Sequence, residues 1–292
     1  MDPSASLTLL LIVSAYHATT SATTYTFIAD VMCKVPASDP SSGAGTGTIT
    51  ASVRAVMPSH PACAEALAMA KASLPASVLY HSFRVYLYAQ AFIRIFLDTP
   101  RPSSPAAAHQ QHPGDSGEEN YTDFAATPGL TARALPHVLF VACILHDVGT
   151  SAQHDAVPER FEVVSADVAA RLLRSHGTSE TAVRDAWLAM ALHTSPGIAE
   201  RLGGTVRAMR LAVRADFGSY PAPPPDTLPG GVDCANMIRW SLPRLEIEKD
   251  LGNAVVRQAL LEPQKAPSAS WPGDLVRAKK AEPEWDGVNR GF

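Results

Sequence analysis

The sequence contains no dense run of Lys or Arg, and its formal net charge is only −4 over 292 residues. Nucleic acids and anionic membranes attract clustered positive charge, so we expect no nucleic-acid partner and no membrane partner. No apolar run reaches the roughly 18 residues that a membrane-spanning helix needs. These absences favour a small-molecule substrate. Association of the chain into a homo-oligomer is also consistent with the sequence.

Closely spaced cysteines are also missing. No Cys-x-x-Cys motif joins the four cysteines, which are Cys33, Cys63, Cys143 and Cys234. We therefore expect reduced, mostly buried thiols and a cytoplasmic protein, without a zinc knuckle or a disulfide framework. Secretion is the alternative, because an apolar run at 7–13 and small residues at 20–22 resemble a weak signal peptide. The preceding segment has Asp2 but no Lys or Arg, which favours an N-terminal extension over residues 1–24.

Strand patterns are absent as well, since we find no alternation of apolar and polar residues, no hairpin signal and no internal repeat. Apolar residues instead recur at helical spacing, most clearly every fourth residue from 79 to 91, after Pro75 and before Pro100. We therefore predict an all-α fold. Further helices are expected at about 62–70, 135–145, 160–175, 180–192, 205–215 and 245–261.

Two stretches rich in Pro, Gly and Ser interrupt the helical pattern. Such residues lose more entropy on ordering than their small buried surface can repay. We expect loop insertions near 36–60 and 98–130, the second of them mobile, with His109 and His112 simply solvated. Both insertions belong to one predicted domain over 25–272, which a C-terminal tail over 273–292 follows.

Two His-Asp pairs occur, and their surroundings differ. His146-Asp147 closes an apolar helix, where burying two ionisable side chains is costly unless they are paired or bound to an ion. Both can turn toward one cation, which the partial negative charge at a helix C-terminus favours. A hydrogen-bonded core histidine is the alternative. His154-Asp155 lies in a polar stretch that Pro158 ends, so we expect a surface loop there.

Two further residues are candidates for the same site. Asp216 follows an apolar helix, and its alternative role is that of a hydrogen-bonded acidic cap. His81 lies near the start of the expected helix around 79–91, where the alternative is a buried histidine held by a hydrogen bond. The order His81, His146-Asp147, Asp216 resembles the HD-domain superfamily, whose metal ligands come from separate helices. The resemblance is closest to the cyanamide hydratase-like branch and covers about 27–271, through HSFRVY at 81–86, LHDVGT at 145–150, RFEV at 160–163 and ALHTSPG at 191–197.

This resemblance implies a multi-helix HD-domain bundle that binds one divalent metal ion. The implied ligands are His81, His146, Asp147 and Asp216. Zinc is the implied ion, with Fe²⁺ and Mn²⁺ as alternatives, because nitrogen and oxygen ligands of borderline hardness discriminate little among these ions.

The resemblance further implies a metal-dependent hydro-lyase that hydrates a small nitrile, such as cyanamide, to urea. Glu162 and His193 are the implied proton-delivering residues; a surface acid and a carbonyl-capping histidine are the alternatives. Thr150 stands where many HD phosphohydrolases carry Lys, and only Arg84 and Arg160 supply positive charge near the motifs, which weakens a phosphohydrolase function. Arg84 itself is expected on an exposed helix face. A phosphohydrolase acting on a phosphate ester or nucleotide, a non-catalytic HD module that binds a small molecule, and a metal-dependent oxygenase remain as other functions.

Overall fold

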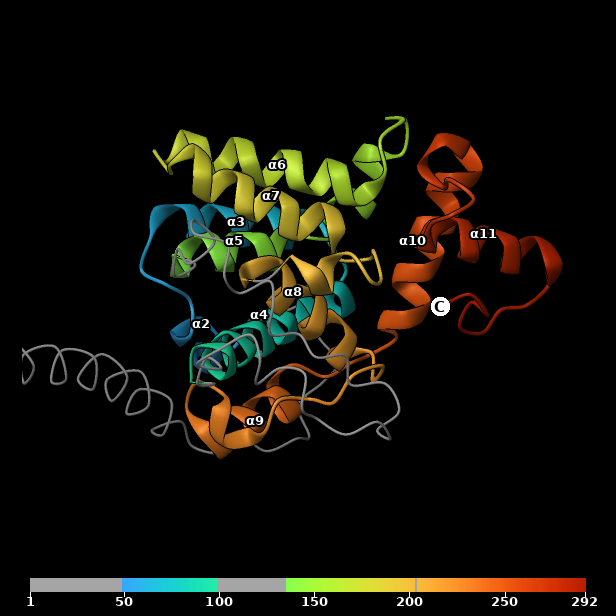
Figure 1. The fold of residues 1–292 in the computed structure, drawn as a ribbon. Helices are drawn as coiled ribbons and strands as arrows, with labels where there is room; N and C mark the ends of the chain where they lie inside the picture. Colours follow the sequence, from blue (N-terminus) through green and yellow to red (C-terminus); the bar gives the residue numbers. More distant parts are fainter. Residues whose placement is uncertain (1–48, 99–134, 203) are drawn as a thin grey trace, which may run out of the picture.

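The computed structural model describes residues 49–98, 135–202 and 204–292, and this part of the chain is all-helical, with ten α-helices and no strand (Figure 1). The all-α prediction is confirmed. The expected N-terminal extension, most of the 98–130 insertion, Cys33, His109 and His112 lie outside the described residues. None of the described helices combines the length and the apolar character needed to cross a bilayer.

The centre of the bundle is α5 (Pro136–Leu145), which is packed against α3 (Pro61–Ser73), α4 (Ala76–Asp98), α6 (Phe161–Ser175) and α7 (Glu180–Leu192) (Figure 1). Every side chain of α5 from Val138 to Leu145 is buried. A helix surrounded on all sides needs apolar residues on all sides, which explains its uniform sequence. Pro136 occupies the first turn, where its missing N–H costs nothing.

The long helix α4 lies across α5 and packs most extensively against α8 (Gly204–Asp216). The predicted period is confirmed, because Leu79, Phe83 and Leu87 are all buried. This packing brings the C-terminal end of α8 beside the first half of α4.

The helices α6 and α7 run side by side along one edge of the bundle (Figure 1). Gly177, with φ of +72°, ends α6, and the N–H of Thr178 donates to the carbonyl of Leu173 at 3.0 Å. A left-handed glycine after the last turn is a common helix terminator.

Three of the described helices were not expected from the sequence: α2 (Ala51–Ala55), α9 (Gly231–Ser241) and α11 (Trp271–Ala281). The helix α11 packs against α10 (Ile247–Leu261) at one side of the bundle, and it spans the expected boundary between domain and tail at residue 272 (Figure 1). The short helix α2 lies within the expected loop insertion near 36–60. The other predicted helices agree with the structure within a few residues.

Candidate metal centre

Three side chains expected at a metal site come together in the interior. His81 belongs to α4, whereas His146 and Asp147 follow the last residue of α5. All three are fully buried. The Nε2 atoms of His81 and His146 are 3.2 Å apart, and Asp147 Oδ2 lies 3.2 Å from the Nε2 of His146 and 3.8 Å from that of His81.

The hydrogen bonds of the two imidazoles place one ring proton of each residue on Nδ1. Nδ1–H of His146 donates to the carbonyl of Cys143 at 2.7 Å, and Nδ1–H of His81 donates to Asp216 Oδ2 at 2.6 Å. A neutral imidazole carries one proton, so each Nε2 presents its lone pair. With both rings in this neutral form, the two Nε2 lone pairs face each other and the carboxylate of Asp147.

The carboxylate of Asp147 is buried, and neither of its oxygens has a hydrogen-bond partner among the described residues. An isolated carboxylate is far too costly to bury without compensating charge. A tetrahedrally bound Zn²⁺, with ligands at about 2.0–2.2 Å, separates neighbouring donor atoms by about 3.4 Å. The separations of 3.2, 3.2 and 3.8 Å fit such an ion. The group can therefore hold one metal ion, although the donor set does not select among zinc, iron and manganese.

Burial and charge keep these residues in the protonation states that a metal requires. Burial lowers the pKa of His146 to about 3, so its ring is neutral at physiological pH. Burial alone would raise the pKa of Asp147, but the imidazoles of His146, His193 and His81 outweigh it and hold that pKa below its usual range. Neutral imidazole and ionised carboxylate are the forms that bind metal.

Asp216, the fourth expected ligand, lies on the opposite side of the His81 ring. Its Oδ2 accepts the bond from Nδ1 of His81, and its two oxygens accept from Nε and Nη2 of Arg84 at 2.6 and 2.8 Å. Burial would raise the pKa of Asp216, but Arg84 and His81 hold it below its usual range. A carboxylate in this position fixes the tautomer and the orientation of a metal-binding histidine.

Arg84 itself is buried, so the expected exposed position is wrong. Besides Asp216, its guanidinium contacts the carbonyls of Leu242 and Pro243. The partners that neutralise this arginine come from α8 and from the loop before α10, which are distant in sequence.

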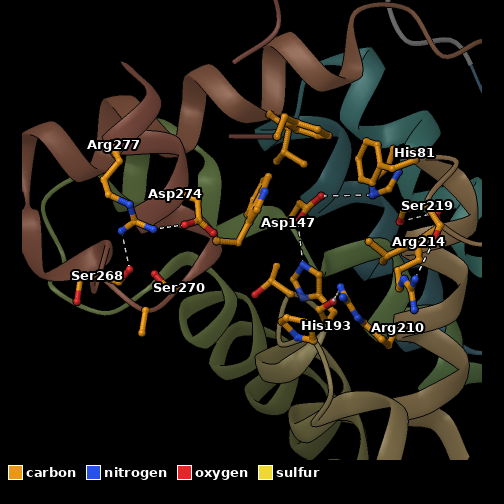
Figure 2. A pocket seen from close by; sticks show the side chains of 18 residues that line it. His81, Asp147, His193, Arg210, Arg214, Ser219, Ser268, Ser270, Asp274 and Arg277 are labelled. Atoms are coloured by element: carbon orange, nitrogen blue, oxygen red, sulfur yellow. Dashed lines mark hydrogen bonds and ion pairs between the residues drawn. The ribbon is translucent and has the colours of Figure 1, made fainter. Parts of the chain in front are cut away.

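His193 ends α7 in the same way that His146 ends α5. Its Nδ1–H donates to the carbonyl of Met190 at 2.6 Å, three residues earlier, so its Nε2 also presents a lone pair. That Nε2 lies 3.6 Å from Asp147 Oδ1, which is too long for a hydrogen bond. Figure 2 shows Asp147 between His81 and His193.

Glu162 is fully buried in the first turn of α6, which rules out the surface-acid alternative. Its carboxylate accepts from Arg160 Nη2 at 2.5 Å and from the hydroxyl of Thr194 at 2.6 Å. Glu162 is not among the residues that line the adjacent pocket, whereas Thr194 is. Glu162 therefore reaches the pocket through Thr194.

The loop after Asp147 is held from two sides. On one side, Gly149 lies against α6, where a Cβ atom would overlap the carbonyl oxygen of Phe161. On the other side, Gln258 of α10 donates to the carbonyls of Gly149 and Ser151 at 2.9 and 3.2 Å. The hydroxyl of Thr150 donates to the Asp147 carbonyl and takes no part in the pocket.

The second His-Asp pair lies apart from this centre, as predicted. His154 is partly buried in a short 3₁₀ helix (Ala152–His154), and its Nε2 contacts the side chain of Gln153. Burial would raise the pKa of Asp155, but the hydrogen bonds that it accepts from Arg257 and Gln258, with the charges of Arg257 and Lys265, outweigh burial and lower that pKa.

The metal centre opens into a pocket of about 430 Å³ (Figure 2). His81, Asp147 and His193 contribute the polar end. The basic residues of the lining are Arg210 and Arg214, which both lie close to Glu200, and Arg277, which pairs with Asp274. Sequence reasoning missed the apolar part of the lining, which consists of Val213, Phe217, Leu251, Trp271 and Phe292.

Compared with known proteins, the sequence matches no family model and no curated protein.

Proposed function

We propose that the protein is a metal-dependent hydro-lyase that adds water to a small nitrile such as cyanamide. The observation that carries this proposal is the buried Asp147 carboxylate, which has no hydrogen-bond partner among the described residues and faces the Nε2 atoms of two histidines. It lies at the polar end of a pocket large enough for a small molecule. The type of reaction, hydration of a nitrile, is inferred from the resemblance of the sequence motifs to those of cyanamide hydratase-like HD domains.

His81, His146 and Asp147 are the residues that would hold the metal ion, and Asp216 orients His81. A bound divalent ion supplies this site with a water that ionises near neutral pH. Because His81 and Asp147 also line the pocket, an ion held by these three residues would be accessible to a small substrate, as a catalytic zinc site requires.

His193 is the proposed proton carrier. Hydration of cyanamide forms one C–O bond, and both protons of the water finish on nitrogen, giving urea. His193 lines the pocket, its ring is fixed by Met190, and its Nε2 can take up a proton. That Nε2 lies 3.6 Å from Asp147 Oδ1, which places it beside the metal centre, within reach of a bound substrate. Glu162 is a positioning residue that acts through Thr194.

A phosphohydrolase is the second candidate, because Arg210 and Arg214 line the same pocket and dianionic phosphates need fixed positive donors. Both guanidinium groups lie near Glu200, at 2.8 and 3.6 Å from its Oε1, and Arg210 also donates to the carbonyl of His193. Much of their charge is thereby neutralised. Arg84 is fully engaged with Asp216 and the two backbone carbonyls, which favours the neutral nitrile.

The experiment offers cyanamide and a panel of phosphomonoesters to the purified protein in parallel. We expect metal-dependent formation of urea and no release of phosphate. His193→Ala and Glu162→Gln should slow hydration while the protein retains its metal, whereas the matched control His154→Ala should leave both unchanged. Metal-dependent phosphate release without urea would establish the phosphohydrolase instead, and no turnover with intact metal would favour a binding module.

A further inference from the structure

The pocket is much larger than cyanamide requires. A water molecule, with one heavy atom, occupies about 30 Å³ of liquid, so a molecule of three heavy atoms takes up no more than roughly 90 Å³. The cavity of about 430 Å³ is several times larger and falls in the range of pockets that enclose larger organic ligands. A cyanamide molecule at the metal centre would leave most of this space to water.

An aromatic wall runs from the metal centre along the pocket. The ring of Phe217 lies 4.7 Å from that of His81, and Phe292 contacts Phe217 at 4.9 Å and Trp271 at 5.4 Å between ring centroids. Phe217, Trp271 and Phe292 all line the cavity, and each keeps part of its surface accessible. Concave apolar surface of this kind gains free energy when a ligand displaces its water.

The chain is shaped to hold Phe292 in this wall. Gly252 on α10 lies beside the ring, where a Cβ atom would be in van der Waals contact with Phe292 Cδ2 at 3.4 Å. A Cβ atom on Gly291 would lie 2.7 Å from the carbonyl oxygen of Asp274, so the backbone approaches α11 as closely as only glycine permits. The amide of Asn289 also donates to the carbonyl of Leu275 at 3.0 Å.

From these observations we infer that the pocket contains a subsite for a flat apolar group, made by Phe217, Trp271 and Phe292. The substrate class is then a nitrile with an aromatic or cyclic apolar substituent, whose nitrile carbon reaches the metal centre. This substrate class rests on the proposed function, but the subsite rests on the pocket alone. In the reaction, R–C≡N and H₂O give R–C(=O)NH₂, with one new C–O bond and both water protons on the amide nitrogen.

The test compares two product amides that differ only in the substituent. Isothermal titration calorimetry of the metal-loaded protein should show benzamide binding at least about tenfold more tightly than acetamide, as ring stacking and apolar burial predict. Phe292→Ala should reduce this preference to about twofold, and Phe292→Leu, which keeps apolar volume without a flat ring, should give an intermediate value. Trp240→Ala, at a side chain that is 69% exposed on α9 and outside the pocket, is the control and should keep the full preference.

Equal affinities for the two amides, or no binding of benzamide at millimolar concentration, would overturn the subsite. Turnover of benzonitrile and cyanamide then separates the two proposals. Selective benzamide binding without hydration of either nitrile would refute the proposed function and keep the subsite. Hydration of both nitriles with equal kcat/KM would refute the subsite and keep the function.

Discussion

Gly149 links the metal centre to the packing of the bundle, so Gly149→Ala tests both. The new Cβ atom would overlap the carbonyl oxygen of Phe161 and lie 2.9 Å from Ser165 Oγ and 3.0 Å from the Phe161 carbonyl carbon. Two of these atoms are backbone and cannot rotate away. The loop and α6 would therefore have to separate, which strains the bond from the Gly149 N–H to Ser165 Oγ, now 2.8 Å long.

The expected cost follows from these contacts. Overpacking a rigid interior costs about 1–3 kcal/mol, and a weakened buried hydrogen bond costs about 1 kcal/mol more. A loss of about 3 kcal/mol corresponds to a fall in Tm of roughly 6–12 °C for a domain of this size. Because Asp147 is two residues away, metal affinity should fall as well.

Gly177→Ala is the matched control, because its Cβ atom would meet nothing within 4 Å and the only penalty is its φ of +72°. That penalty is about 1 kcal/mol, or roughly 2–4 °C. Differential scanning calorimetry of both variants, with and without a chelator, gives the comparison. The reasoning would be refuted if Gly149→Ala melted no lower than Gly177→Ala and bound metal normally.

Three further predictions concern orientation, protonation and thiols. Asp216→Asn should weaken metal affinity about 10- to 100-fold, because the carboxylate that orients the ring of His81 is lost. Complete loss of metal would instead indicate that Asp216 binds the ion directly. In metal-free protein, burial depresses the pKa of His146 to about 3, so its stabilising contribution is present above about pH 6.5 and is lost as pH falls toward 3. Melting from pH 7 to 4 should show this decline, and a pH-independent Tm would contradict it. In a Cys33→Ser variant no thiol should react with a disulfide reagent before denaturation, because burial raises the pKa of Cys63, Cys143 and Cys234.

The helices with clear apolar periodicity were predictable from sequence. The apolar period of α4 and the uniform apolar run of α5 were enough to predict both helices, because the side of a helix that is buried must carry apolar residues. The helix α11 was missed because Pro272 and Gly273 resemble helix breakers. In the structure Pro272 occupies the first turn, and Ser270 caps the helix by accepting from the Gly273 N–H. The available signal was Ser270 as N-cap with a proline two residues later, in the first turn.

The candidate site was predictable only in part. The order of His81 and His146-Asp147 predicted that they would meet, and they do. Sequence could not show that Asp216 faces Nδ1 of His81, because that depends on how α8 packs against α4 and on the burial of Arg84. The aromatic wall was equally hidden, since it is formed by segments that meet only in the folded chain.

The central claim is that one metal ion neutralises the buried carboxylate of Asp147. Elemental analysis of the purified protein by inductively coupled plasma mass spectrometry tests it directly. The account predicts about one transition-metal ion per chain, lost in His146→Ala and in Asp147→Ala but retained in His154→Ala, whose side chain lies in the other His-Asp pair. Full metal content in the His146 and Asp147 variants, or no metal in the unaltered protein even after incubation with Zn²⁺, Fe²⁺ or Mn²⁺, would contradict it.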